Sequence, residues 1–198
     1  MVLTVDDLAL KYSDYTDIIG KIRREVQAGN LIQVSRGLYE TDKNADGKYL
    51  AGYIYGPSYL SFDYALAVYS LIPEAVYKTY TSATFGKNRK KRYQNAFGLY
   101  TYRDVPKAVF SLGVNICVEN GYSYQIATPE KALCDKLYSL PPVGSVRALK
   151  ELLFDDLRID ENGLMSLDIE SICQIAPLYG CNNLKILAKY LSNERGLQ

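Results

Sequence analysis

The sequence contains no histidine and no tryptophan, and it has only four cysteines. The absence of histidine excludes Ser-His-Asp and Cys-His nucleophilic catalysis, histidine-ligated zinc, and any switch that depends on an imidazole titrating near neutral pH. The cysteines are Cys117, Cys134, Cys173 and Cys181, and no two of them form a C-x-x-C pair. We therefore expect buried free thiols in a reducing compartment, and neither a structural metal site nor a cofactor.

Long apolar runs are also absent. No run approaches the roughly eighteen apolar residues that a membrane span needs, and the opening MVLTVDDLALKY lacks a cationic leader followed by an apolar block. We expect no membrane association and a cytoplasmic location. The 198 residues are enough for one large domain or two small ones, and a composition of 48% apolar and 23% charged residues is typical of globular proteins.

The charge is unevenly distributed, although its sum is only +1. Residues 78–107 contain eight Lys or Arg side chains against the single acid Asp104, a net charge of +7. Five of these bases fall within GKNRKKR, residues 86–92. Between two predicted strands this segment is either a solvated hairpin tip or a phosphate-contacting patch. In the second case the contacts would come from Lys87, Arg89, Lys90, Lys91 and Arg92.

Two short helices are predicted near the start of the chain. Thr4 precedes the first, and Asp6 and Asp7 in its first turn favour the helix dipole. After a tight turn at residues 13–15, Thr16 is expected to cap a second helix over residues 16–28, which Gly29 ends. The apolar side chains of that helix form one stripe, and its opposite face is polar.

After Gly29 the pattern becomes extended, with a bend at Arg36-Gly37. Helix, turn, helix and a basic β-segment is the order of a winged helix-turn-helix, which we place at residues 1–45. In such a module Lys21 and Arg24 would contact groove edges, with Thr16 at the helix start, and Arg23 and Arg36 would contact the DNA backbone. The alternative is a helical pair that packs on a hairpin, with solvated Lys and Arg side chains.

A second domain is expected over residues 46–198, after the polar linker at residues 42–48. It should contain a helix at 61–71 with Tyr64, Ala65, Val68 and Leu71 buried, strands at 76–85 and 96–102, and a hairpin turning at Asn120-Gly121. Thr128-Pro129 opens a helix, and three more helices are expected at 145–154, 168–176 and 182–192. The predicted fold class is therefore α+β: a winged helix-turn-helix, then an α/β domain with a small mixed or antiparallel sheet and a helical C-terminal tail.

Three segments of this sequence resemble the AbiEi family of antitoxins from bacterial abortive-infection systems. They are VQAGNLIQVSRGLYE at 26–40, YLSFDYALAVYSLI at 59–72 and ATPEKALCDKLYSL at 127–140, and together they span most of the chain. The resemblance implies a two-domain repressor whose winged helix binds the operator DNA of its own operon. It also implies a functional partner, a nucleotidyltransferase-like toxin of a type IV toxin–antitoxin pair, which is countered without a stable complex.

One departure from this family pattern concerns the first domain. A winged helix usually has three helices, and this sequence begins at what would be the second, so we expect a truncated module with a thin core. A protein-interaction antitoxin module without DNA binding of its own is therefore the first alternative to a DNA-binding antitoxin-like transcriptional regulator.

Two enzyme classes are the remaining hypotheses. A nucleotidyltransferase would need paired acids after Gly144-Ser145, but Leu157 occupies the second acid position after Asp155. A metal-dependent nuclease would draw on Asp104, Glu119, Glu130 and Lys131, although helix capping explains Glu130 equally well. We therefore predict a protein that is not an enzyme and has no catalytic residues.

Overall fold

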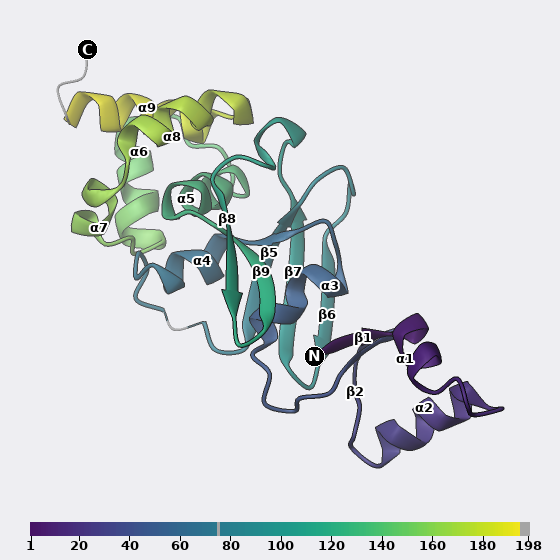
Figure 1. Cartoon of the computed structure of the whole chain (residues 1–198). Helices are drawn as coiled ribbons and strands as arrows, with labels where there is room; N and C mark the ends of the chain where they lie inside the picture. Colours follow the sequence, from purple (N-terminus) through teal and green to yellow (C-terminus); the bar gives the residue numbers. More distant parts are fainter. Residues whose placement is uncertain (75, 195–198) are drawn as a thin grey trace.

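The computed structural model describes residues 1–74 and 76–194 (Figure 1). Within these residues the chain forms nine α-helices, a three-stranded sheet at the N-terminal end and a separate six-stranded sheet. The predicted α+β class, the mixed sheet and the helical C-terminal region are confirmed. No helix of the described part of the chain combines the length and the apolar character that crossing a bilayer demands.

The N-terminal module comprises residues 1–41 (Figure 1). Along the chain, its two helices follow the first strand and precede the second. The antiparallel strand order is β1-β3-β2. A small core of its own holds the module together, made by Leu3, Leu8, Ile22 and Leu31. Its elements are β1 (Val2–Thr4), α1 (Val5–Lys11), α2 (Ile18–Gln27), β2 (Ile32–Ser35) and β3 (Leu38–Glu40).

The helix ends of this module follow the expected chemistry with one correction. Thr4 caps α1 as predicted, because its hydroxyl accepts the Asp7 amide at 3.2 Å. The prediction that Thr16 caps α2 is wrong: Asp17 does so, since its Oδ1 accepts the Gly20 amide at 2.8 Å. The connection between the helices is accordingly longer than a three-residue turn. Gly29 follows the last turn of α2 with φ of 77°, the left-handed conformation predicted for it.

The central sheet has the strand order β6-β7-β5-β4-β9-β8. Strands β5 and β7 are parallel neighbours, β4 and β9 are also parallel, and the other pairs are antiparallel. The predicted hairpin between β8 and β9 is confirmed, with φ of 50° at Asn120 and 79° at Gly121. The strands are β4 (Tyr59–Leu60), β5 (Thr79–Thr84), β6 (Lys91–Asn95), β7 (Gly98–Asp104), β8 (Val114–Glu119) and β9 (Tyr122–Ala127).

The basic segment is not a hairpin tip between two adjacent strands, as one of our hypotheses had it. Its last two residues, Lys91 and Arg92, begin β6, which pairs with β7 and lies at the sheet edge. The preceding residues form the connection from β5, and because β7 lies between β5 and β6, this connection crosses the end of β7. The charged and turn-forming residues correctly predicted a loop in this segment. They could not predict which strands are neighbours, because strand order depends on tertiary packing.

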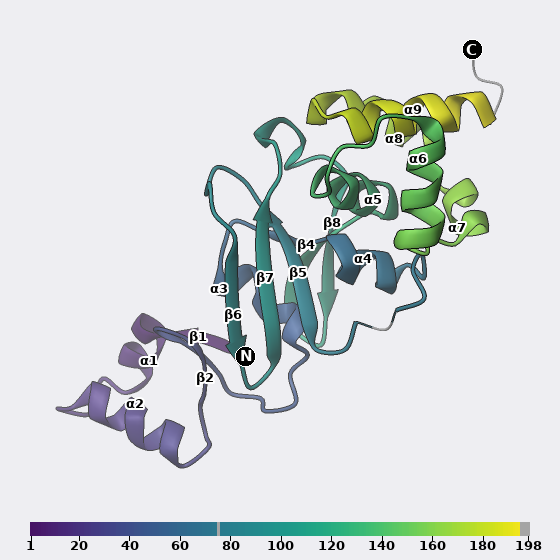
Figure 2. The same ribbon diagram turned by 180° about the vertical axis from the view of Figure 1, so that it is seen from behind.

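The C-terminal helices gather beyond α4 and α5, on the side of the central sheet away from the N-terminal module (Figure 2). Thr128 caps α5 as predicted, with Pro129 in the first turn. Val68 was expected to be buried, but it is 52% exposed because α4 ends at this residue. The helices are α3 (Ala51–Ile54), α4 (Phe62–Val68), α5 (Pro129–Tyr138), α6 (Val146–Lys150), α7 (Glu161–Ser166), α8 (Ile169–Ile175) and α9 (Asn182–Glu194).

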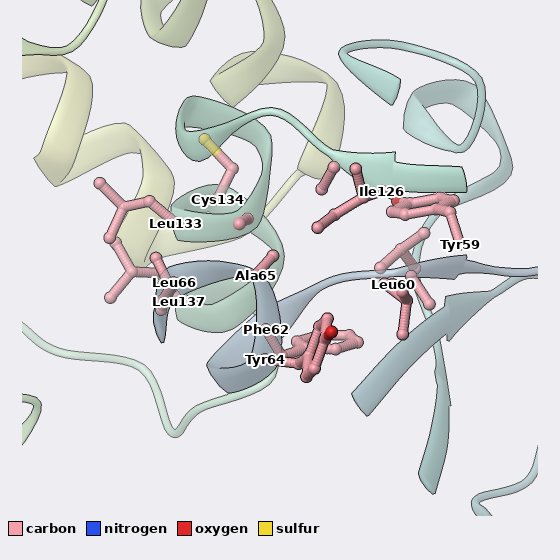
Figure 3. Packing of buried hydrophobic residues seen from close by; sticks show 14 of the residues in the cluster. Tyr59, Leu60, Phe62, Tyr64, Ala65, Leu66, Ile126, Leu133, Cys134 and Leu137 are labelled. Atoms are coloured by element: carbon pink, nitrogen blue, oxygen red, sulfur yellow. The ribbon is translucent and has the colours of Figure 1, made fainter. Parts of the chain in front are cut away.

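The main core lies where α4 and α5 pack beside the central strands (Figure 3). Helix α5 also buries an ion pair, Lys131 to Asp135 at 2.9 Å, in which both side chains are 0% exposed. Hydroxyl groups of Tyr59, Ser61 and Tyr179 donate to the same carboxylate at 2.9, 2.7 and 2.6 Å. Every oxygen of Asp135 is therefore satisfied, which is the condition for burying such a pair.

Candidate nucleic-acid interface

Helix α2 presents two arginines to solvent. Ile22 is buried in the core of the N-terminal module, and this contact fixes the rotation of the helix so that the neighbouring Arg23 and Arg24 face outward. The Arg24 side chain is 60% exposed, and its nearest carboxylate, that of Asp17, is 3.9 Å away. An ion pair of this length and exposure binds weakly, so both guanidinium groups are available to an anion.

Lys21, which was predicted to contact a DNA groove, is engaged within the module. Its ammonium donates to Glu25 at 2.5 Å and lies 5.5 Å from the ring centre of Tyr12 and 4.9 Å from that of Tyr15. The hydrogen bond with Glu25 raises the pKa of Lys21 and lowers the pKa of Glu25. Only 21% of the Lys21 side chain is exposed, so its charge is largely neutralised inside the molecule.

Glu25 is the residue that the sequence argument overlooked on this face. It lies one helical turn after Lys21, the spacing at which opposite charges meet on a helix, and this signal was readable in the sequence. Glu25 also accepts Asn30 Nδ2 at 2.8 Å, which ties the C-terminal end of α2 to the start of the β2–β3 hairpin. Thr16 lies exposed at the bend before the cap of α2.

The β2–β3 hairpin supplies a further exposed arginine. Arg36 and Gly37 form its tip, and Gly37 takes a positive φ of 76°, a backbone conformation that favours glycine. The Gly37 carbonyl accepts the Val5 amide at 3.2 Å, so the tip lies against the start of α1. Arg36 is exposed and forms no ion pair among the described residues.

The basic loop, residues 86–92, is held by one carboxylate. Asp104, at the end of β7, accepts the backbone amides of Lys87 at 2.7 Å and Asn88 at 2.6 Å, and it also accepts the Thr84 hydroxyl at 2.6 Å. The Lys87 ammonium folds back to donate to the Gly56 carbonyl at 3.2 Å. Lys91 is partly buried, whereas the remaining bases are exposed, namely Arg89, Lys90 and Arg92.

The structure does not bring the two groups of predicted DNA-contacting residues together. The last residue of β6, Asn95, donates to the Val34 carbonyl of the N-terminal module at 2.9 Å. The basic loop precedes the first residue of β6, at the opposite end of a strand that spans roughly 13 Å. Figure 2 shows this separation, with α1 and α2 near one end of β6 and the loop beyond the other.

The acidic residues considered for a nuclease are dispersed. Asp104 anchors the basic loop, and Glu119 pairs with Lys48 at 2.6 Å at the tip of the β8–β9 hairpin. Glu130 accepts a backbone amide at the start of α8, and Lys131 is buried with Asp135. Within residues 1–74 and 76–194 no three Asp, Glu or Cys side chains are grouped so that they could hold a metal ion.

Comparisons with known proteins bear on none of these residues. No protein-family model matches the sequence, and no curated protein matches it.

Proposed function

We propose that the chain is a DNA-binding, antitoxin-like transcriptional regulator whose N-terminal module contacts duplex DNA. The observation that supports this best is the arrangement of three exposed arginines: Arg23 and Arg24 on α2, and Arg36 at the tip of the β2–β3 hairpin. A helix and a neighbouring β-hairpin that both present guanidinium groups fit the two ways in which such modules contact DNA, in the major groove and along the backbone. The strand order β1-β3-β2 with two intervening helices is compatible with a winged helix.

The proposed DNA contacts are ranked differently from those predicted from the sequence, where Lys21 was a groove contact. Arg23, Arg24 and Arg36 carry the binding, because they are exposed and only Arg24 has an acid within 4 Å, at 3.9 Å. Lys21 contributes by holding α2 and the Tyr12–Tyr15 turn in place. The basic loop is an accessory phosphate surface that meets a different stretch of the duplex, because it lies at the far end of β6.

Fluorescence anisotropy tests this proposal, with labelled duplex DNA from the region upstream of the gene and a salt series from about 50 to 200 mM. Replacing Arg23, Arg24 and Arg36 with Ala should weaken binding at least tenfold and reduce the salt slope by about 0.9 for each phosphate that these side chains no longer neutralise. Arg147→Ala is the matched control, since this arginine is 91% exposed on α6 and lies outside the proposed surface. Equal affinity of the triple variant and the control would contradict the proposal.

The antitoxin role rests on the family resemblance and has a separate test. Co-expression with a nucleotidyltransferase-like toxin encoded beside the gene should restore growth, and the proteins should not co-purify as a stable complex. We place this activity in the cytoplasm and assign it no metal, cofactor or catalytic residue.

The second candidate function is a protein-interaction module without DNA binding. It is favoured by two exposed apolar side chains of the N-terminal module, Leu10 at 79% and Ile19 at 50%. Under this alternative, Leu10→Ser with Ile19→Ser would abolish toxin neutralisation, whereas the arginine variants would leave it intact. The same two sets of variants therefore separate the two functions.

A further inference from the structure

The two edge strands of the central sheet differ in how they are protected. Strand β6 begins with Lys91 and Arg92, and its other end contacts the N-terminal module through Asn95. Charged residues and covering segments of this kind prevent an edge from pairing with another chain. Strand β8 has no Lys, Arg or Pro, and it exposes Ile116 by 69% and Val118 by 74%.

The hydrogen-bonding pattern of the β8–β9 hairpin fixes which backbone groups face the free edge. In a two-residue turn the flanking pair, here Glu119 and Tyr122, is hydrogen-bonded, and the bonded pairs then alternate along the ladder. The Thr128 amide donates to the Gly113 carbonyl at 2.8 Å, which agrees with this alternation. The amides and carbonyls of Val114, Ile116 and Val118 therefore point away from β9, and no strand of the described residues pairs with them.

We propose that β8 is a homodimer interface, in which a second copy of this chain adds its own β8 antiparallel about a two-fold axis through Ile116. In this register Ile116 lies opposite itself and Val114 lies opposite Val118. Each of these three pairs exchanges two backbone hydrogen bonds, and the two central sheets join into one.

Charge and side-chain chemistry favour a second copy as the occupant of this edge. The three residues with outward backbone groups are all β-branched and apolar, so every pair across the axis is apolar and of a type that packs well between strands. The only charged residue of β8, Glu119, lies opposite Gly113 of the other copy, so the two carboxylates do not face each other. An axis through Val118 would instead bring the Asn120-Gly121 turns into the interface and leave Val114 unpaired.

The interface is one strand wide, which places it among small and reversible contacts. We therefore expect a monomer–dimer equilibrium that depends on concentration in the micromolar range. The proposed interface uses residues of β8 and none of the arginines proposed to contact DNA, so the inference is independent of DNA binding.

Disulfide trapping tests the register directly, in the full-length chain with Cys117→Ser as background. Across a hydrogen-bonded pair two Cα atoms are about 5.5 Å apart, within the range that a disulfide spans, so Ile116→Cys should form a covalent dimer under mild oxidation. Val118→Cys is the matched control, because the two copies of residue 118 would be four residues out of register, roughly 14 Å apart. Equal trapping at both positions, or trapping at neither, would overturn the proposed pairing.

Sedimentation velocity over a range of about 1–300 μM tests the equilibrium without cross-linking. The unmodified chain should shift from monomer to dimer, and Ile116→Lys should remain monomeric because like charges would then meet on the axis. Val68→Lys introduces the same charge at a half-exposed site on α4 and should dimerise normally. Circular dichroism should show both variants folded, since each replaced side chain is at least half exposed. An unmodified chain that stays monomeric throughout the range would refute the proposal and leave the edge to a strand of another protein.

Discussion

At the scale of single residues, the buried Lys131–Asp135 pair is the part of the fold that we expect to tolerate substitution least. Burial lowers the pKa of Lys131, and Asp135 opposes this effect through its charge and its hydrogen bond. Asp135 accepts three hydroxyl groups besides the ammonium, whereas the ammonium of Lys131 donates to Asp135 and the Tyr179 hydroxyl and otherwise lies near the rings of Tyr59 and Tyr179. If Lys131 is removed, the Asp135 carboxylate keeps three hydrogen-bond donors. If Asp135 is removed, the Lys131 ammonium loses its only charged partner among the described residues.

This asymmetry predicts which of two substitutions lowers the free energy of unfolding more. Asp135→Ala should lower the free energy of unfolding by about 3–5 kcal/mol, because it leaves a buried ammonium without a counter-charge. Lys131→Met should cost less, because three hydroxyl donors still stabilise the carboxylate. Urea denaturation followed by circular dichroism measures both, and a larger loss for Lys131→Met would contradict the argument.

At the scale of elements, capping and turn chemistry was the most predictable part of the fold. Asn120-Gly121 and Thr128-Pro129 act through local hydrogen bonds and backbone preferences, so the hairpin and the start of α5 followed from the residues alone. Asp17 caps α2 where Thr16 was predicted. Both side chains can accept a hydrogen bond from the first turn, and the path of the preceding turn decides which one does. Helix α7 was missed because Gly163 interrupts its pattern.

Pairing across the chain was less predictable. The parallel alignment of β5 with β7, and with it the position of the basic loop, depends on tertiary packing. In the candidate site, the exposed arginines followed from helical periodicity, and the Lys21–Glu25 pair was readable from its spacing. The two tyrosine rings over Lys21 were not readable, because they come from the irregular turn before α2.

The basic loop gives a prediction at this scale. Asp104 accepts two backbone amides and one hydroxyl that connect the end of β5 to the loop, so Asp104→Ala should cost about 1–3 kcal/mol and release the loop. Amide hydrogen exchange should then accelerate at Lys87 and Asn88 while the β8–β9 hairpin keeps its protection. Asp155→Ala, at an exposed site beyond α6, is the control and should change neither quantity. Unchanged exchange at the loop in Asp104→Ala would show that other contacts hold it.

At the scale of the whole molecule, buried tyrosines make the stability of the folded state depend on pH in the alkaline range. Burial is the largest cause that raises the pKa of six phenols in the core, those of Tyr59, Tyr64, Tyr80, Tyr100, Tyr102 and Tyr179. The folded chain therefore keeps protons that the unfolded chain releases near pH 10. Because the folded state then binds more protons than the unfolded state, stability is lost as pH rises above about 10, and these groups have no effect below it.

The expected loss is about 1.4 kcal/mol per pH unit for each buried phenol that stays protonated. Urea denaturation between pH 8 and 11 measures this slope, and Tyr102→Phe should reduce it by about one such increment because one proton is removed from the balance. Tyr53→Phe is the matched control: its side chain is 53% exposed in the fold, so the slope should not change. Tyrosinate absorbance should rise for the core phenols only as secondary structure is lost, since a phenolate in this core would have no water to solvate it. Six of the nineteen tyrosines belong to this core set, so the thirteen others can raise the absorbance while the fold persists. If the folded chain, by its circular dichroism, gained more tyrosinate absorbance than those thirteen can supply, the core phenols would be ionising without unfolding, and burial would not link them to stability.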